Sequence, residues 1–235
     1  MLRYSQQMIV GELGLEGQQQ LAAARVLIIG AGGLGTPVAA YLAAAGVGTI
    51  GIMDGDVVAV SNLARQFLYT SDEVGREKAS LLAAKLSSQN PGIKIHPVSA
   101  MLTAANAMAS CTDYDIICDC TDNVEARMLI NDVCGQLQKP LVFAAVKEWE
   151  GYVAVLHHTQ QVSLPALFPL SSFQQEAMAG CAITGIINTT CGFAGTVQAT
   201  EVIKLILHLP SELDGGLLCF NLLTPVVRVF RLNRV

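Results

Sequence analysis

Residues 25–35 read RVLIIGAGGLG, and this stretch decides the fold of the chain. An aliphatic run leads directly into a glycine-rich turn, and the residues behind the turn have the pattern of a helix. Gly30, Gly32 and Gly35 let the backbone bend sharply and let a phosphate approach without a Cβ in the way. The following helix directs its free N–H groups and its positive dipole end at that phosphate. The stretch therefore predicts a strand, a phosphate-binding turn and a helix.

A second apolar run follows this helix and ends in an acidic residue, Asp54. Asp54 stands roughly 20 residues beyond the turn, where an acid at the end of the next strand accepts hydrogen bonds from ribose hydroxyls. Strand, turn, helix, strand and acid together predict a nucleotide-binding half-fold. A tight turn without any ligand is the alternative interpretation, and the flanking elements with Asp54 favour the nucleotide. The pattern does not identify which nucleotide binds.

The composition narrows the class of protein. Of the 235 residues, 52% are hydrophobic and 14% are charged, which predicts a buried parallel sheet and a subunit interface. Residues 26–53 are uncharged, but their glycines and Pro37 argue against a membrane span. The net charge of −5 argues against a nucleic-acid partner. The N-terminus lacks a signal-peptide layout, and cysteines without a regular framework are typical of a reducing compartment, so we expect a cytoplasmic protein.

The remaining pattern predicts how the chain is organised. Helices are expected over residues 13–24, 73–89, 103–109, 124–138 and 189–209, and strands over 93–98, 115–119 and 140–146. This alternation predicts an α/β fold with a Rossmann-like, doubly wound, mostly parallel sheet. A strand over 151–157 and a hairpin of 216–221 with 226–232 predict an antiparallel C-terminal extension. Residues 160–179 read as an irregular stretch, longer than most loops.

Polar side chains stand just past the ends of predicted elements, where open α/β sheets bind ligands. These residues are Asn62, Arg65, Gln66, Lys78 and Asp122. Arginine and lysine beside a triphosphate would hold its oxygens and offset the charge that builds up during displacement at phosphorus. An aspartate at a strand end would hold Mg²⁺, which prefers carboxylate, water and phosphate oxygens.

Four segments resemble, in order and spacing, the ThiF/MoeB/HesA family, which is related to the ubiquitin-activating enzymes. They are RVLIIGAGGLG (25–35), DGDVVAVSNLARQFLY (54–69), VGREKASLLAAKL (74–86) and CDCTDN (118–123). S-N-L-x-R-Q and C-T-D-N are far more specific than the glycine turn, which nicotinamide-dependent dehydrogenases share. Because the resemblance runs from Leu2 to Arg234, we expect one ThiF-type adenylation domain over residues 1–235. Its ATP-binding half would span about 1–146, and its carrier-binding and dimerisation half about 147–235.

The resemblance implies a nucleotidyltransferase that uses ATP and Mg²⁺. Its expected substrate is the C-terminal Gly-Gly carboxylate of a small ubiquitin-like sulfur carrier, ThiS-like or MoaD-like. Pyrophosphate leaves, and the acyl-adenylate is then open to a sulfur nucleophile. The resemblance also implies a homodimer that serves thiamin or molybdopterin biosynthesis. The residues identify neither the carrier nor the pathway.

The family motifs imply ATP-binding roles for the residues that match them. These are Gly30, Gly32, Gly33, Gly35, Asp54, Asp56, Asn62, Arg65, Gln66, Lys78, Asp122 and Asn123. Arg65 and Lys78 match the triphosphate clamp, and Asp122 matches the magnesium ligand, so these three are candidate catalytic residues. A solvated surface pair is the alternative for the two cations, and their order in the motifs favours the clamp. The simpler interpretation of Asp56 is an acid that caps its own turn.

Two departures from the family concern the metal and the dimer. The family's structural zinc needs two C-x-x-C pairs. Ser163 and Ala166 stand where the first pair is expected, and the sequence ends at Val235, just short of the second, so we expect no structural zinc. The signature R-Y-x-R-Q reads RYSQQ, with Gln6 replacing an arginine that in relatives reaches the partner's ATP. Catalysis could be slower, Arg3 could compensate, or the activity could be lost.

Cysteines and histidines add further candidates. Cys181 stands where ThiF-like members carry a cysteine that can bond to the carrier, and we name it a candidate catalytic residue. A small apolar residue near a helix start is the alternative. Cys118 and Cys120 share one face of a strand, and core packing is a better interpretation than a metal site. Of His157 and His158, we expect one to be packed and the other exposed.

Two other functions stay open. The enzyme could adenylate another peptide carboxylate in a secondary-metabolite pathway, and the missing zinc cysteines and Gln6 agree with such divergence. A non-catalytic homologue could instead bind a carrier or pair with an active partner. Arg65, Lys78 and Asp122 are all present, and this counts against the non-catalytic interpretation.

Overall fold

A computed structural model describes residues 2–168 and 185–231. Its strands are β1 (Arg25–Ile29), β2 (Thr49–Met53), β3 (Lys94–Val98), β4 (Ile116–Asp119), β5 (Leu141–Lys147), β6 (Glu150–Leu156), β7 (Gly216–Asn221) and β8 (Val226–Arg231). Its α-helices are α1 (Gly14–Ala23), α2 (Gly35–Ala45), α3 (Lys78–Gln89), α4 (Ala107–Thr112), α5 (Val124–Leu137), α6 (Leu164–Leu167) and α8 (Asn188–Ile206). Single 3₁₀ turns cover Leu2–Tyr4, Gln7–Ile9, Val60–Asn62 and Ser71–Glu73.

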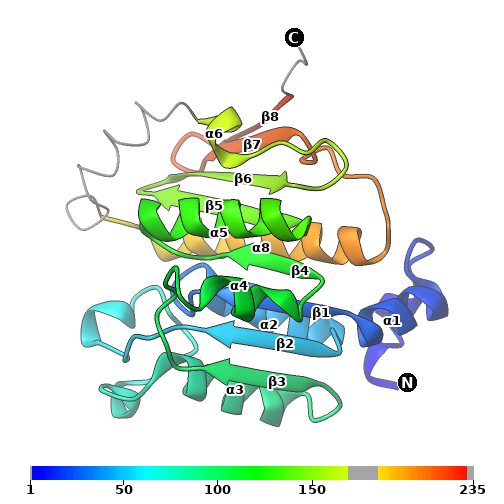
Figure 1. Cartoon of the computed structure of the whole chain (residues 1–235). Helices are drawn as coiled ribbons and strands as arrows, with labels where there is room; N and C mark the ends of the chain where they lie inside the picture. The colour runs from blue at the N-terminus through cyan, green and yellow to red at the C-terminus, as the bar shows by residue number, and fades with distance from the viewer. Residues whose placement is uncertain (1, 169–184, 232–235) are drawn as a thin grey trace.

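The strands form one eight-stranded sheet in the order β3-β2-β1-β4-β5-β6-β7-β8 (Figure 1). The pairs from β3 to β5 are parallel, and the pairs from β5 to β8 are antiparallel. The predicted fold, a mostly parallel doubly wound sheet with an antiparallel C-terminal extension, is therefore confirmed. The chain order reverses between β1 and β4, which is the switch point where open α/β sheets bind ligands.

Helices cover both faces of the parallel part because its strands are apolar on both sides. Val26 and Ile28 of β1 pack in one core cluster with α2, α3 and α8. Leu27 and Ile29, which alternate with them, pack in the other cluster with α4 and α5. Figure 1 shows α4 and α5 in front of the sheet and α2 and α8 behind it. The period of two along β1 thus produces the layered architecture.

The strand register brings three chain segments to one edge of the sheet. Ile29 stands opposite Met53 of β2 on one side and Asp119 of β4 on the other. The glycine turn and the loops after β2 and β4 therefore leave the sheet at the same level.

The glycine turn requires glycine at two positions for steric reasons. Gly30 has a φ of 101°, and a Cβ there would lie 2.5 Å from the carbonyl oxygen of Cys120. A Cβ on Gly35 would lie 1.8 Å from the carbonyl oxygen of Gly30. The turn is packed backbone against backbone, which leaves its opposite side open to a ligand.

Some predicted boundaries are wrong, and local geometry explains why. The helix expected from residue 73 begins only at Lys78, because the Glu73 side chain closes a 3₁₀ turn and Gly75 has a φ of 87°. The helix expected from residue 103 begins at Ala107, because the Asn106 side chain accepts the N–H of Thr103. Within the stretch predicted as irregular, the described part holds the short helix α6, and residues 169–179 lie outside the described residues.

No helix among residues 2–168 and 185–231 has the length and apolar character that crossing a membrane requires.

Candidate active site

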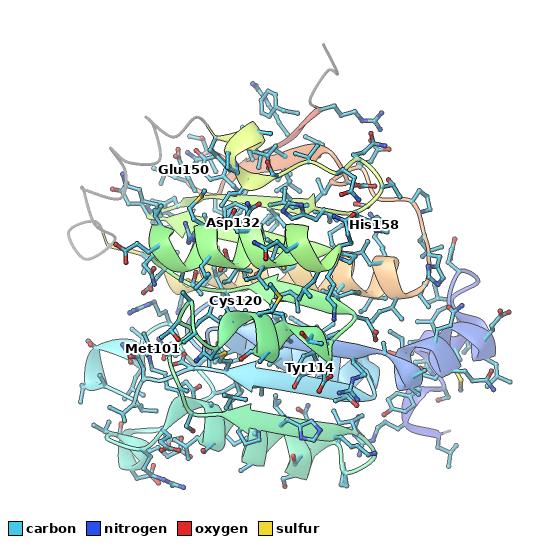
Figure 2. The ribbon with its side chains drawn as sticks, viewed as in Figure 1. Met101, Tyr114, Cys120, Asp132, Glu150 and His158 are labelled. Carbon is cyan, nitrogen blue, oxygen red and sulfur yellow. The ribbon has the colours of Figure 1, made fainter. Side chains whose placement is uncertain are left out.

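A cavity of about 750 Å³ opens at the carboxyl edge of the parallel strands. Met101 and Cys120, labelled in Figure 2, lie on its wall. Most predicted ATP-binding residues line the same cavity: Gly30, Gly32, Gly33, Asp54, Asp56, Asn62, Arg65, Gln66, Lys78, Asp122 and Asn123. Gly35 lies beneath the turn instead, against Gly30. The structure thus gathers residues from the loops after β1, β2 and β4 and from the start of α3 around one space.

Asp54 ties the glycine turn to the end of β2. One carboxylate oxygen accepts the N–H of Ala31 at 2.7 Å, and the other accepts the N–H of Asp56 at 2.7 Å. Burial raises the pKa of Asp54, and these two N–H groups act in the opposite direction. Because a carboxylate offers about four acceptor positions, lone pairs remain for the hydroxyls of a ribose.

Lys78 supplies a buried cation beside the turn. Its side chain is only 6% exposed, and its ammonium lies 2.9 Å from the carboxylate of Asp56, which is 60% exposed. The backbone N–H of Lys78 also donates to the carbonyl of Asp56 at 3.0 Å. Asp56 therefore does not cap its own turn with its side chain, as the simpler interpretation predicted, but serves as the anionic partner of Lys78.

The loop that carries Arg65 is shaped by consecutive tight turns. The N–H groups of Arg65 and Gln66 both donate to the carbonyl of Asn62, at 3.0 and 2.9 Å. Arg65 is half-buried and packs beside Gly33, where an added Cβ would lie 3.5 Å from the Arg65 Cγ. Gln66 is 3% exposed, and its Oε1 has no hydrogen-bond partner among the described residues. A buried acceptor on a cavity wall is a position that a ligand donor would satisfy.

The loop after β4 presents Asp122 to the cavity. Asp119 is fully buried, and one of its oxygens accepts the N–H of Thr121 at 2.9 Å and its hydroxyl at 2.7 Å. Arg127 donates to the carbonyl of Thr121 at 2.8 Å. Burial raises the pKa of Asp119, and the charge of Arg127 opposes this rise. This network fixes the turn, so the Asp122 side chain is exposed at the cavity wall. The Asn123 oxygen instead accepts the N–H of Ala126 and caps α5.

The donor set agrees with Mg²⁺ held together with a ligand. In the described ranges, no three side chains of His, Cys, Asp or Glu are grouped as for a metal ion. Asp122 alone would therefore need phosphate oxygens and water to complete a coordination shell. Mg²⁺ is commonly bound in this way, through one or two carboxylates plus substrate phosphates.

The ThiF family profile matches residues 4–234. The chain belongs to the ThiF family. Among its relatives is the sulfur carrier protein adenylyltransferase of Thermus thermophilus, 38% identical over 237 residues, which cover 99% of this chain and 87% of that protein. The adenylyltransferase and sulfurtransferase MOCS3 of Caenorhabditis briggsae is 43% identical over 235 residues, covering 99% and 58% respectively. This ThiF-family chain spans about half the length of the MOCS3 proteins it matches.

Solved structures share the fold of this ThiF-family chain. Escherichia coli MccB, crystallised with ATP, matches it with a TM-score of 0.86 at 20% identity. The match covers 99% of this chain and 71% of that chain. At this identity the likeness establishes the common architecture.

The cavity of the ThiF-family chain also contains a cysteine that sequence reasoning missed. Cys191 lies in the first turn of α8, and a Cβ on Gly33 would lie 2.9 Å from its Sγ. Burial raises the pKa of Cys191 to about 11, and the charge of Arg65 opposes this rise. The thiol is therefore protonated at neutral pH and is a poor nucleophile. The predicted candidate, Cys181, lies outside the described residues.

The remaining cysteine and histidine predictions have mixed outcomes. Cys118 and Cys120 are buried in the core, and burial raises the pKa of both thiols, so core packing is confirmed. His157 is buried and its Nε2 lies 2.9 Å from the Asn131 side-chain oxygen, which confirms one packed histidine. His158 is half-buried rather than exposed, so that part of the prediction is wrong.

The N-terminal signature RYSQQ (residues 3–7) does not line the cavity. The Tyr4 hydroxyl accepts a hydrogen bond from Asn90 at 2.7 Å, and its ring covers Gly46 at the C-terminal end of α2. Arg3 and Gln6 are exposed, and neither is among the described residues that line the cavity.

Proposed function

We propose that the chain is an ATP-dependent adenylyltransferase that activates the C-terminal Gly-Gly carboxylate of a small ubiquitin-like sulfur carrier. The observation that carries the proposal is the meeting of Asp54, Arg65, Lys78 and Asp122 with the glycine turn around one cavity. The names of the Thermus thermophilus and Caenorhabditis briggsae relatives both support adenylation, and the name of the Thermus thermophilus relative supports a sulfur carrier as the substrate. Family membership supports the same reaction class.

The cavity suggests how ATP binds. Asp54 would accept hydrogen bonds from the ribose, as an acid at the end of the second strand does in nucleotide-binding folds. The phosphates would follow the turn toward the N-terminus of α2, whose free N–H groups favour anions. Arg65 and Lys78 would contact the phosphates, and Asp122 would hold the Mg²⁺ bound to them. Glycine at positions 32 and 33 keeps the path of the phosphates clear.

The proposed step is a displacement at the α-phosphorus. A carboxylate oxygen of the carrier forms a bond to this phosphorus, and the bond to pyrophosphate breaks. Arg65 and Lys78 stabilise the negative charge that builds up on the phosphate oxygens. Bound Mg²⁺ would supply further positive charge at the phosphates. Because Asp56 is largely exposed, it can swing away and leave the buried ammonium of Lys78 to the phosphates.

The end of β5 and the segment that leads into α8 form another part of the cavity wall. Val146 and Lys147 from the end of β5 and Ile186 line this wall. Backbone bonds hold it closed: the N–H of Glu148 donates to Gly185 at 3.1 Å, and the N–H of Ile187 donates to Glu148 at 3.3 Å. We infer that the Gly-Gly tail enters along this wall and meets the phosphates near Arg65.

The direct test is ATP–pyrophosphate exchange with a purified carrier. We expect exchange that requires Mg²⁺ and a free Gly-Gly carboxylate, and no exchange with the same carrier amidated at its C-terminus. ATP binding without exchange for any Gly-Gly carrier would favour the non-catalytic alternative. Exchange with a peptide that lacks Gly-Gly, and none with carriers, would favour the secondary-metabolite alternative, which Ser163, Ala166 and Gln6 suggest.

We further propose that the protein is a homodimer, that it is cytoplasmic, and that it serves thiamin or molybdopterin biosynthesis. Supporting the dimer, large apolar side chains are exposed around the N-terminal turns, α1 and α2: Leu2, Ile9, Val10, Leu15 and Tyr41. Covering these side chains with a second copy would remove apolar surface from water. Light scattering at micromolar concentration tests this, and a monomer would contradict it. Metal analysis tests the expected lack of structural zinc, which stays a prediction.

We propose that Cys181 has no role in adenylation and acts only in the later transfer of sulfur. Adenylation needs a carboxylate, ATP and cations, so a thiol has no task in that step. We therefore expect Cys181→Ala to retain pyrophosphate exchange and to affect only sulfur transfer. Loss of exchange in a folded, ATP-binding Cys181→Ala protein would place this cysteine in the first step instead.

A further inference from the structure

One buried hydroxyl joins three segments of the cavity wall without lining the cavity itself. Tyr69 is 4% exposed, and its Oη lies 2.9 Å from the carbonyl oxygen of Ala31 and 3.3 Å from that of Lys78. Ala31 belongs to the glycine turn, and Lys78 is the first residue of α3. Tyr69 itself follows the Arg65 loop, and its N–H donates to the carbonyl of Gln66 at 3.0 Å.

The two acceptors of this hydroxyl are held from their other sides by acidic residues of the site. The N–H of Ala31 donates to the Asp54 carboxylate, and the carbonyl of Ala31 accepts from Tyr69. The backbone of Ala31 is therefore held on both sides. The N–H of Lys78 donates to the carbonyl of Asp56, and its carbonyl faces Tyr69. The same hydroxyl therefore contacts both backbone segments whose partners are Asp54 and Asp56.

The hydroxyl is suited to act as a permanent donor. It carries one hydrogen, which it gives to one carbonyl at a time, and the shorter distance favours Ala31. Burial raises the pKa of Tyr69, and the charges of Asp54 and Glu73 raise it further. The hydroxyl thus stays protonated across the physiological range. Phenylalanine would keep the ring but leave the enclosed carbonyls without this donor.

We propose that Tyr69 is a positioning residue that holds the glycine turn, the Arg65–Gln66 segment and Lys78 in the arrangement that binds a nucleoside triphosphate. It contacts no substrate and acts through these three segments. The inference deepens the proposed function and rests on it only for the identity of the ligand, ATP. If the hydroxyl is removed, the cationic groups and the turn lose their common anchor, and affinity for the triphosphate falls.

The test compares Tyr69→Phe with Tyr114→Phe. Tyr114 is a matched control because it is also buried and lies just before β4, at the edge of the sheet opposite the cavity (Figure 2). Its ring centroid lies 5.7 Å from the Cζ of Arg25. ATP binding by calorimetry should weaken about tenfold in Tyr69→Phe and stay unchanged in Tyr114→Phe. In pyrophosphate exchange, KM for ATP should rise by a similar factor, while kcat changes by less than about threefold.

Two outcomes would overturn the proposal. One is an ATP affinity in Tyr69→Phe within twofold of wild type. The other is a fall in kcat that matches a loss of folded protein, with KM unchanged, since that pattern describes a structural role alone. Hydrogen–deuterium exchange gives a second measure: amides of residues 30–35 should exchange faster in ligand-free Tyr69→Phe, and equal protection would count against the anchor. If wild type binds ATP without exchanging pyrophosphate, the proposed function fails while the Tyr69 comparison remains readable.

Discussion

The ammonium of Lys78 lies 2.9 Å from the carboxylate of Asp56, yet the two side chains differ sharply in exposure, at 6% and 60%. A buried ammonium without a partner would be costly, and Asp56 supplies that partner from the solvent side. Because Asp56 is exposed, replacing it by a phosphate exchanges one anionic partner for another while the cation stays in place. The site is therefore prepared for a triphosphate without an unpaired buried charge.

Lys78→Met should strongly reduce the rate of adenylation. The substitution keeps an unbranched side chain of nearly the same length and removes the charge, so we expect pyrophosphate exchange to fall by about 10²-fold or more. Lys94→Met is the matched control because Lys94 is exposed at the start of β3. Lys85 is unsuitable for this purpose, since its ammonium pairs with Glu73 at 2.7 Å. Wild-type exchange in Lys78→Met would remove this residue from the proposed clamp.

Asp122→Asn should raise the Mg²⁺ requirement. The amide retains the shape but lacks the negative charge that a hard divalent cation needs. We expect the Mg²⁺ concentration for half-maximal exchange to rise by about tenfold or more, with thermal stability near wild type because Asp122 is exposed. Asp113→Asn, an exposed aspartate after α4, is the control. An unchanged Mg²⁺ titration in Asp122→Asn would contradict the proposed metal ligand.

Gly33→Ala should weaken ATP binding in a way that Cys191→Ala partly restores. The new methyl group would lie 2.9 Å from the Cys191 Sγ. Overpacking of this kind typically destabilises a protein by about 1–3 kcal/mol. Removing the sulfur gives the methyl room, so the double variant should bind ATP better than Gly33→Ala alone. The comparison is a double-mutant cycle measured by calorimetry. Strictly additive effects would show that the two residues do not contact each other.

Alkylation of Cys191 should depend steeply on pH. With a pKa of about 11, only about one thiol in a thousand is ionised at pH 8, and the thiolate is the reactive form. We expect the rate to rise about tenfold per pH unit between pH 7 and 10. ATP should protect Cys191 and leave Cys219, on β7, unprotected. Peptide mass spectrometry separates the two sites, and fast alkylation of Cys191 at neutral pH would indicate an activated thiol.

The fold was largely predictable because its signals are local. The aliphatic run before the glycine turn, the alternation of elements and the C-terminal hairpin all reflect periodicities within short windows. The start of α3 was not predictable in this way, since it depends on the Glu73 side chain closing the preceding turn and on the positive φ of Gly75. The apolar residues keep a helical spacing through residues 73–77, although the backbone there is not α-helical.

The gathering of Asp54, Arg65 and Lys78 around one cavity was predictable because these residues belong to recognisable sequence motifs, while their roles with a ligand stay predictions. Cys191 was missed because its place depends on the packing of α8 against the glycine turn, far away in sequence. Tyr69 was missed for a related reason: an aromatic residue in an apolar run indicates burial but not the carbonyls that its hydroxyl contacts. Tertiary packing, rather than spacing, determines both.

The most direct test of the central claim follows the oxygen atoms of the carrier. A Gly-Gly carrier with ¹⁸O in its C-terminal carboxylate would be incubated with the enzyme, ATP and Mg²⁺, and the product cleaved with a sulfur nucleophile. If the carboxylate attacks the α-phosphorus, one labelled oxygen must leave in AMP. Mass spectrometry of AMP should therefore show ¹⁸O with wild type, and carrier-dependent AMP should form about 10²-fold more slowly with Lys78→Met. AMP without the label, or no carrier-dependent AMP from wild type, would contradict adenylation of the carrier carboxylate.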